Sequence, residues 1–180
     1  MKRVALCVLP ALVVGSALAH PVDEVVQGAY LTLAPGKVAL ELNVTPGAEV
    51  AGAVLKGLDP NGDGKVTDGE ARRYARTVLS QSTLKVDGKG AAWTLDRVQV
   101  PPVRVLRLGG GILKIYASAK RADRLGTRTL FYENRYQPAR TQRTANVFLQ
   151  PSGNWQFQVA AQTRTDDGRA LTVTYTQRRS

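Results

Sequence analysis

The chain has 180 residues and a formal net charge of +11, with 25 Lys and Arg, 14 Asp and Glu, one Cys and one His. This length predicts one domain, or one domain with a tail. A single Cys excludes an internal disulfide, and a single His limits any Ser-His-Asp or Cys-His catalytic site to His20.

Residues 1–19 have the features of a secretory signal peptide. A basic Met-Lys-Arg start precedes an apolar run that is too short to span a bilayer comfortably, and small residues precede His20. We therefore predict a periplasmic or secreted protein that begins at His20 and has lost Cys7. An uncleaved membrane anchor is the alternative. No later segment is apolar enough to span a membrane, so the mature protein is expected to be soluble and not itself transmembrane.

The positive charge predicts attraction to polyanions. Removal of Lys2 and Arg3 would lower the charge from +11 to about +9, and the remaining Lys and Arg are spread along the chain. This spread favours a generally basic surface. The sequence lacks a recognised nucleic-acid-binding motif, so we expect no nucleic-acid partner. An anionic lipid surface or an anionic envelope polymer is the more plausible partner for the charge.

From residue 24 onward, apolar residues mostly alternate with polar ones, as they do in half-buried strands. Residues 25–45 predict a β-hairpin around an Ala-Pro-Gly-Lys turn. One face of its second strand is apolar and consists of Val38, Leu40, Leu42 and Val44. Further strands are predicted at 82–86, 91–100, 103–108, 112–120, 128–136, 144–150, 155–164 and 170–177.

Turn residues separate these strands. Pro101 and Pro102 cannot donate ladder hydrogen bonds and predict a break or an edge. The three glycines at 109–111 predict a hairpin connection, and residues 166–169 predict the last turn. Trp155, Phe157, Val159 and Ala161 are expected on one face of their strand. So many short strands with frequent turns predict a mainly β protein, an antiparallel β-sandwich.

Residues 47–81 interrupt this rhythm. Residues 47–58 and 68–81 carry apolar residues at helical spacing and predict two short amphipathic helices. Residues 59–70 lie between them and match the EF-hand pattern, in which Asp59, Asn61 and Asp63 occupy positions one, three and five, with Gly64 at position six. The sandwich domain, residues 20–180, is thus predicted to contain an EF-hand insertion at 47–81.

The spacing suits Ca²⁺, which takes six to eight oxygen ligands. Lys65 would contribute its backbone carbonyl, Thr67 a direct or water-mediated contact, and Glu70 a bidentate carboxylate. The predicted metal ligands are Asp59, Asn61, Asp63, Lys65, Thr67 and Glu70. An ordinary turn of Asp, Asn and Gly is the alternative. A single loop without a Met-rich surface favours a structural role for calcium over a switch.

Other candidate sites are weaker. A free amine and imidazole at His20 would suit copper or nickel, but the chain has no second His. Asp166 and Asp167 are adjacent acids in a turn, and Glu133 lies in an aromatic-rich strand, where we expect it to face outward and pair with a nearby Arg. A carboxylate-based hydrolase remains the weakest hypothesis, and we predict that the protein is not an enzyme.

Three stretches together resemble a known group of domains: residues 19–47, the loop at 59–70, and 131–138 followed by 145–151. They are similar to the β-rich extracytoplasmic domains of bacterial nickel/cobalt transporters and hydrogenase/urease accessory membrane proteins. Only the loop is a specific motif. Those transporters continue into a membrane bundle, whereas this sequence ends at Ser180, so the resemblance implies a stand-alone relative with a separate membrane partner.

The sequence therefore predicts a secreted or periplasmic calcium-binding module with no enzymatic activity. The alternative is a periplasmic nickel, cobalt or copper accessory protein that works with a membrane transporter, using His20 or a surface carboxylate site.

Overall fold

The hairpin predicted at 25–45 forms the centre of one sheet in the computed structural model, which describes residues 22–180. Strand β1 (Val25–Ala34) pairs antiparallel with β2 (Lys37–Pro46). The four apolar residues predicted on one face of β2 are at most 2% exposed, which confirms the period-two pattern. The sheet has the order β5-β6-β2-β1-β8. Its other strands are β5 (Thr94–Gln99), β6 (Leu113–Lys120) and β8 (Thr141–Leu149).

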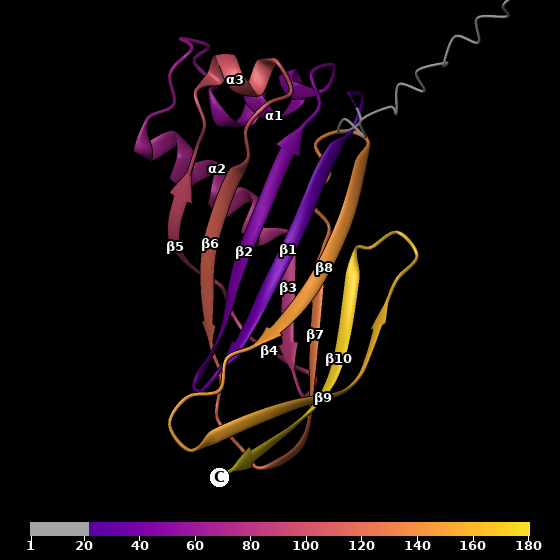
Figure 1. Cartoon of the computed structure of the whole chain (residues 1–180). Helices are drawn as coiled ribbons and strands as arrows, with labels where there is room; N and C mark the ends of the chain where they lie inside the picture. The colour runs from indigo at the N-terminus through magenta and orange to yellow at the C-terminus, as the bar shows by residue number, and fades with distance from the viewer. Residues whose placement is uncertain (1–21) are drawn as a thin grey trace, which may run out of the picture.

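A second sheet packs on the inner face of the first (Figure 1). It has the order β4-β3-β7-β10-β9. The strands are β3 (Ser82–Val86), β4 (Lys89–Gly90), β7 (Gly126–Asn134), β9 (Trp155–Arg164) and β10 (Ala170–Arg179). The inward side chains of both sheets form one apolar core that includes Leu31, Leu42 and Tyr132. The predicted β-sandwich is confirmed, although the pair β1–β8 is parallel.

The two helices predicted around the loop are present. Helix α1 (Ala51–Leu58) is shorter than the predicted 47–58, and α2 (Asp68–Ser80) is close to the predicted 68–81. Each helix buries one apolar stripe of its surface. Helix α1 places Val54 and Leu58 in the core, and α2 places Tyr74 and Val78 there. Helix α2 contacts both β5 and β3. Helices α1 and α3 lie at the end of the sandwich opposite the C-terminus (Figure 1).

The strand predicted at 103–108 is wrong. Residues Val103–Arg107 form helix α3, because Pro102 cannot continue a ladder and instead precedes the first turn of the helix. Val103 and Leu106, three residues apart, are both buried. This spacing is that of one face of a helix and not the every-second-residue burial of a strand.

The predicted hairpin connection at 109–111 is therefore wrong as well. Gly109 has a φ of 73° and donates its N–H to Leu106 O, while Gly110 donates to Val105 O. This pair of bonds closes the last turn of α3 in a Schellman motif. The glycines thus end a helix before β6 begins.

Two other strand predictions change in detail. The strand predicted at 91–100 is shorter, because β4 stays with β3 while β5 joins the opposite sheet. In β9, the register against β10 shifts between Thr174 and Tyr175. The shift leaves Trp155, Phe157 and Val159 toward the core but turns Ala161 to the exposed face, so the prediction for Ala161 is wrong. A bulge of this kind moves every later side chain to the other face.

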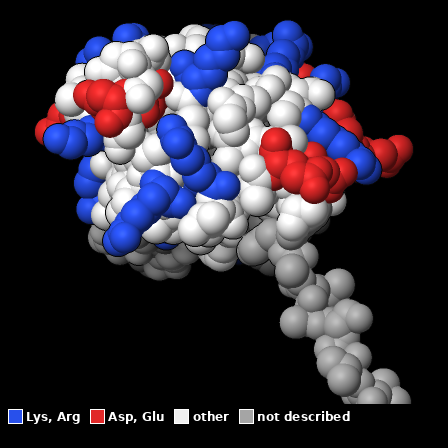
Figure 2. Space-filling view, turned by 90° about the horizontal axis from the view of Figure 1, so that it is seen from above, with Lys and Arg blue, Asp and Glu red and all other residues white. Residues whose placement is uncertain are grey.

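The end of the sandwich that carries α1 and α3 is seen from above in Figure 2. Lys and Arg form several separate groups on this face, and Asp and Glu gather in two places. On this face the basic residues are therefore dispersed and do not form one patch. Within residues 22–180, none of the helices is long and apolar enough to cross a lipid bilayer.

Candidate functional site

The loop at residues 59–70 is positioned by the two helices that it joins. Helix α1 ends at Leu58 and is capped by Asp59, whose N–H donates to Leu55 O, and α2 begins after Thr67. Between them the chain turns at Gly62 and Gly64, with φ values of 71° and 78°. A residue with a Cβ is strained in this left-handed region, so Gly64 has the role predicted for position six of the pattern.

The side chains at the first three predicted ligand positions fold back onto the loop. Asp59 accepts the N–H groups of Gly62 and Gly64 at 3.0 and 3.1 Å, one on each carboxylate oxygen. Asn61 Oδ1 accepts from Asp63 N at 3.3 Å, and Asp63 Oδ1 accepts from Lys65 N at 2.8 Å. These bonds fix the loop backbone in successive turns, with Asp59 itself buried.

At the end of the loop, Glu70 and Thr67 form a capping box. The Thr67 hydroxyl accepts from Glu70 N, and Glu70 Oε2 accepts the Thr67 N–H at 2.9 Å. The Thr67 hydroxyl also lies 2.9 Å from Glu70 Oε2 and donates to it. The motif satisfies two N–H groups that the first turn of a helix otherwise leaves unpaired. It also holds the Glu70 carboxylate beside the loop.

The acidic residues of the loop have no cationic partner among the residues that the structure describes. Residues 59–70 contain four carboxylates and one Lys, a net charge of −3. None of the ion pairs in the described part of the chain involves Asp59, Asp63, Asp68 or Glu70. Lys and Arg outnumber Asp and Glu by 25 to 14 in this protein, yet none of these cations in the described residues pairs with the loop. The four acids therefore leave local negative charge uncompensated. A bound cation would compensate it.

The donor set fits calcium, but the carboxylates are not gathered around one point. Among residues 22–180, no three Asp, Glu, His or Cys side chains form a group that would hold a metal ion. Asp59, Asp63 and Glu70 are each turned onto N–H or hydroxyl groups of the loop. An ionised carboxylate has about four lone-pair positions, so each retains acceptor capacity. Ligation by all six predicted residues would require Asp63 and Glu70 to turn inward.

A buried polar network ties α2 to the sandwich. The hydroxyls of Tyr74 on α2 and Tyr136 lie 2.7 Å apart, and their rings meet edge to face. Burial raises the pKa of both phenols, most strongly that of Tyr74. Both therefore remain neutral at ordinary pH and share one hydrogen bond. Tyr74 belongs to the buried stripe of α2, but its partner lies 62 residues away in the chain, where no local pattern reveals it.

The network continues into both sheets. Gln27 of β1 donates to Tyr136 O at 3.0 Å, and Asn134 of β7 donates to Gln27 Oε1 at 2.6 Å. Asn134 Oδ1 in turn accepts the Tyr136 N–H at 3.0 Å. A satisfied buried network of this kind specifies a single arrangement of the elements that it joins. It therefore fixes the exit helix of the loop against the core.

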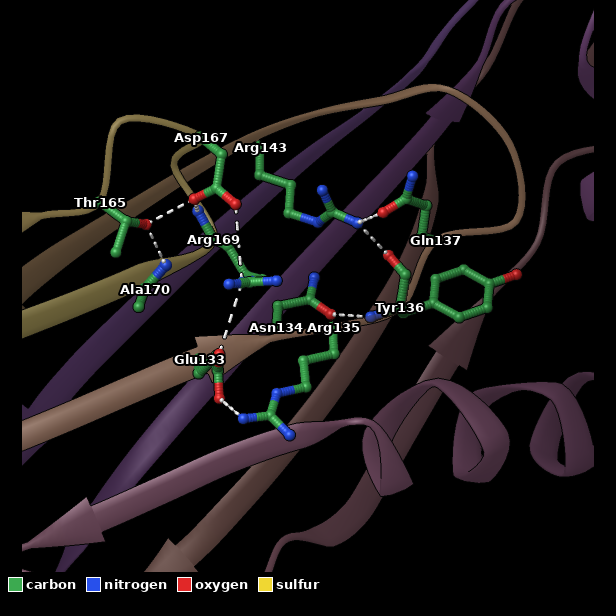
Figure 3. Close-up of polar contacts among 10 residues, drawn as sticks. All are labelled: Glu133, Asn134, Arg135, Tyr136, Gln137, Arg143, Thr165, Asp167, Arg169 and Ala170. Carbon is green, nitrogen blue, oxygen red and sulfur yellow. Dashed lines mark hydrogen bonds and ion pairs between the residues drawn. The ribbon is translucent and has the colours of Figure 1, made fainter.

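The predicted pairing of Glu133 with arginine is confirmed, but the residue is not solvent-exposed as an outward-facing position would suggest, because Glu133 is only 9% exposed. Arg135 and Arg169 lie 2.8 and 3.4 Å from its two carboxylate oxygens. Figure 3 shows Arg169 between the carboxylates of Glu133 and Asp167. A hydrogen bond from Thr165, followed by one from the Arg169 N–H, holds the pKa of Asp167 below its usual range. Arginines and hydrogen-bond donors already occupy the carboxylates of Glu133 and Asp167. A carboxylate held in this way is poorly suited to act as a general acid or base.

His20, the residue predicted for a transition metal, lies outside the described residues, as do the predicted signal peptide and its cleavage point. No protein-family model matches the chain, and a search of curated proteins finds no match. The resemblance to extracytoplasmic domains of metal transporters therefore depends on the quoted residues alone.

Proposed function

We propose that this protein is a calcium-binding module of the bacterial periplasm or exterior, and that it acts by binding a partner and not by catalysis. The observation that carries the proposal is a helix-loop-helix with Asp59, Asn61 and Asp63 at EF-hand positions and Glu70 at its end. Within residues 22–180, none of the loop's carboxylates forms an ion pair. Calcium prefers such hard oxygen donors.

The proposed role of calcium is structural. The loop connects two helices whose apolar stripes already belong to the core, and the bond between Tyr74 and Tyr136 fixes the second helix to the sandwich. Opening the helix pair, as a calcium sensor does, would separate these buried contacts. An ion that neutralises the loop would instead stabilise the arrangement present here.

The resemblance noted in the sequence favours a separately produced membrane transporter as the partner of the module. The spread of Lys and Arg would also attract an anionic lipid surface or polymer.

Calorimetric titration with calcium tests the proposal. We expect one ion per chain, with a Kd of about 0.1–1 mM, the range of extracellular modules. Glu70→Gln should weaken binding by at least about tenfold, because it removes one charge and a bidentate ligand. Glu49→Gln is the matched control, since Glu49 is exposed, lies just before α1 and forms no ion pair within residues 22–180. Absence of binding, or equal weakening by both variants, would refute the proposal.

A further inference from the structure

A second charged site lies at the opposite end of the sandwich, where β6 ends and β7 begins (Figure 1). A pocket of about 170 Å³ is present there, between the β3–β4 hairpin and residues 120–128. Its volume is roughly that of five or six water molecules. Among residues 22–180, five cationic side chains line it, namely Lys89, Lys120, Arg121, Arg124 and Arg128, and Asp87 is the one acid of this lining.

Two of the five cations are already paired. Arg121 forms an ion pair with Asp123 at 2.9 Å, and Arg128 forms one with Asp87. Asp87 also accepts the N–H of Thr129 at 2.9 Å, so both of its carboxylate oxygens are occupied. Lys89, Lys120 and Arg124 form no ion pair with any residue in 22–180. The pocket and its immediate partners therefore retain three uncompensated positive charges.

The pocket has a rigid, buried floor. The side chain of Arg121 is only 1% exposed. It donates to Ala34 O at 2.9 Å and to Gln177 Oε1 at 2.8 Å, while its guanidinium faces the ring of Phe157. The Nε groups of Arg121 and Arg128 are buried and have no hydrogen-bond partner among the described residues. A buried donor without a partner is rare in folded proteins and costs free energy.

We propose that this pocket binds a phosphate group that carries two negative charges. Three uncompensated cations favour a dianion over a carboxylate, and Lys and Arg are the side chains that bind phosphate best. The volume admits one such group with bound water. Free phosphate and the phosphomonoester headgroup of a lipid share this chemistry. The proposal is independent of the calcium loop.

The first test is calorimetric titration of the whole protein with inorganic phosphate, in a chelator so that calcium does not precipitate it. Sodium chloride at matched ionic strength serves as the reference. We expect one saturable site per chain, weakened by added salt because its charges are partly exposed. Lys120→Gln combined with Arg124→Gln should weaken binding by about tenfold or more, and Lys89→Gln alone by about threefold.

The control is Arg104→Gln combined with Arg107→Gln on α3. Both arginines are exposed and free of ion pairs within residues 22–180, so this pair removes the same charge from the opposite end. We expect it to change phosphate binding by less than about twofold. Lys120 and Arg124 are also exposed, and circular dichroism should show all variants folded. Absence of saturable binding to the unaltered protein, or equal weakening by both double variants, would overturn the proposal.

Vesicles distinguish the two sources of phosphate. Neutral phospholipid vesicles are compared with the same vesicles containing phosphatidic acid, which carries a phosphomonoester. Retention on phosphatidic acid vesicles that is lost with Lys120→Gln and Arg124→Gln supports a lipid headgroup. Saturable binding of inorganic phosphate without vesicle binding supports a soluble ligand. If the double variant binds vesicles as well as the unaltered protein does, and free phosphate does not bind, the proposal that this pocket binds phosphate is overturned.

Discussion

Two segments rich in Asp and Gly connect elements of the sandwich: the loop at 59–70 between α1 and α2, and the turn at 165–169 between β9 and β10. In both, Asp side chains accept backbone N–H groups. In the turn, however, Asp167 also faces Arg169, which in turn reaches Glu133. In the loop, no carboxylate forms an ion pair with any residue of the described part, 22–180. The same residue types thus form a turn whose charges are paired in one place, and a loop whose carboxylates form no ion pair within residues 22–180 in the other.

Packing separates the two segments as well. Gly168 has a φ of 66°, and a Cβ there would collide with the backbone oxygen of Arg143 on β8. Gly62 has a similar φ of 71°, but a Cβ there would meet nothing within 4 Å. The turn is pressed against a neighbouring strand, whereas the loop stands free at the surface, where a ligand has access.

The largest expected effect tests this packing difference. Gly168→Ala should destabilise the protein by about 3 kcal/mol or more, because left-handed strain and a backbone clash add together. Gly62→Ala should cost only about 1–2 kcal/mol, the strain alone. Urea unfolding of both variants measures the difference. Equal costs would show that the turn is no more tightly packed than the loop.

The next effect concerns the anchoring of the exit helix. Tyr74→Phe removes one hydroxyl of the buried pair and leaves that of Tyr136 without this partner. We expect a loss of about 1–2 kcal/mol in the free energy of unfolding, measured by urea unfolding. Tyr30→Phe is the control, because no hydrogen bond involves the Tyr30 hydroxyl within residues 22–180, and it should change stability by less than about 0.5 kcal/mol. If Tyr74→Phe left the free energy of unfolding unchanged, the network would not be what holds α2 against the sandwich.

The smallest effects should have opposite signs in the two segments. In a chelator, Asp63→Asn should stabilise the protein by about 0.3 kcal/mol, since it relieves repulsion among unpaired acids. Asp167→Asn should destabilise it at pH 7, because Thr165 and Arg169 favour the ionised carboxylate and lower its pKa. Urea unfolding at neutral and acidic pH measures both variants.

The sign of the pH dependence follows from that lowered pKa. The stabilisation by Asp167 is present above the ordinary Asp pKa of about 3.9 and is lost as the pH falls through the lowered value. The deficit of Asp167→Asn should therefore shrink in acid. A deficit that stays constant with pH would contradict the ionic account of the turn.

Much of this fold follows from local pattern. The hairpin at 25–45 and the helices around the loop were predictable, because each buries one face at its own period. Helix α3 was not, since Val103, Arg104 and Val105 begin an alternating pattern and the preceding prolines do not show whether a helix or a strand follows. The parallel pairing of β1 with β8 and the register shift in β9 depend on contacts between distant segments. Local periodicity contains no information about such contacts.

The same limit applies to the sites. The loop at 59–70 is contiguous, so its spacing alone identifies candidate ligands. The basic pocket brings Lys89 together with Lys120 and Arg124 through the pairing of β3 with β7 and the end of β6. No motif marks those residues, and only the topology shows that their charges are uncompensated.

Thermal unfolding in a chelator and in calcium tests the central claim most directly. With a Kd of about 0.1 mM and about 10 mM calcium, binding to the folded state should contribute about 2.7 kcal/mol. For a protein of this size the midpoint should rise by about 5–11 °C. We expect that rise in the unaltered protein and in Glu49→Gln, a rise of at most about half that size in Glu70→Gln, whose Kd is about tenfold weaker or more, and no rise with magnesium in place of calcium. An unchanged midpoint in calcium, or an equal rise in Glu70→Gln, would contradict the claim.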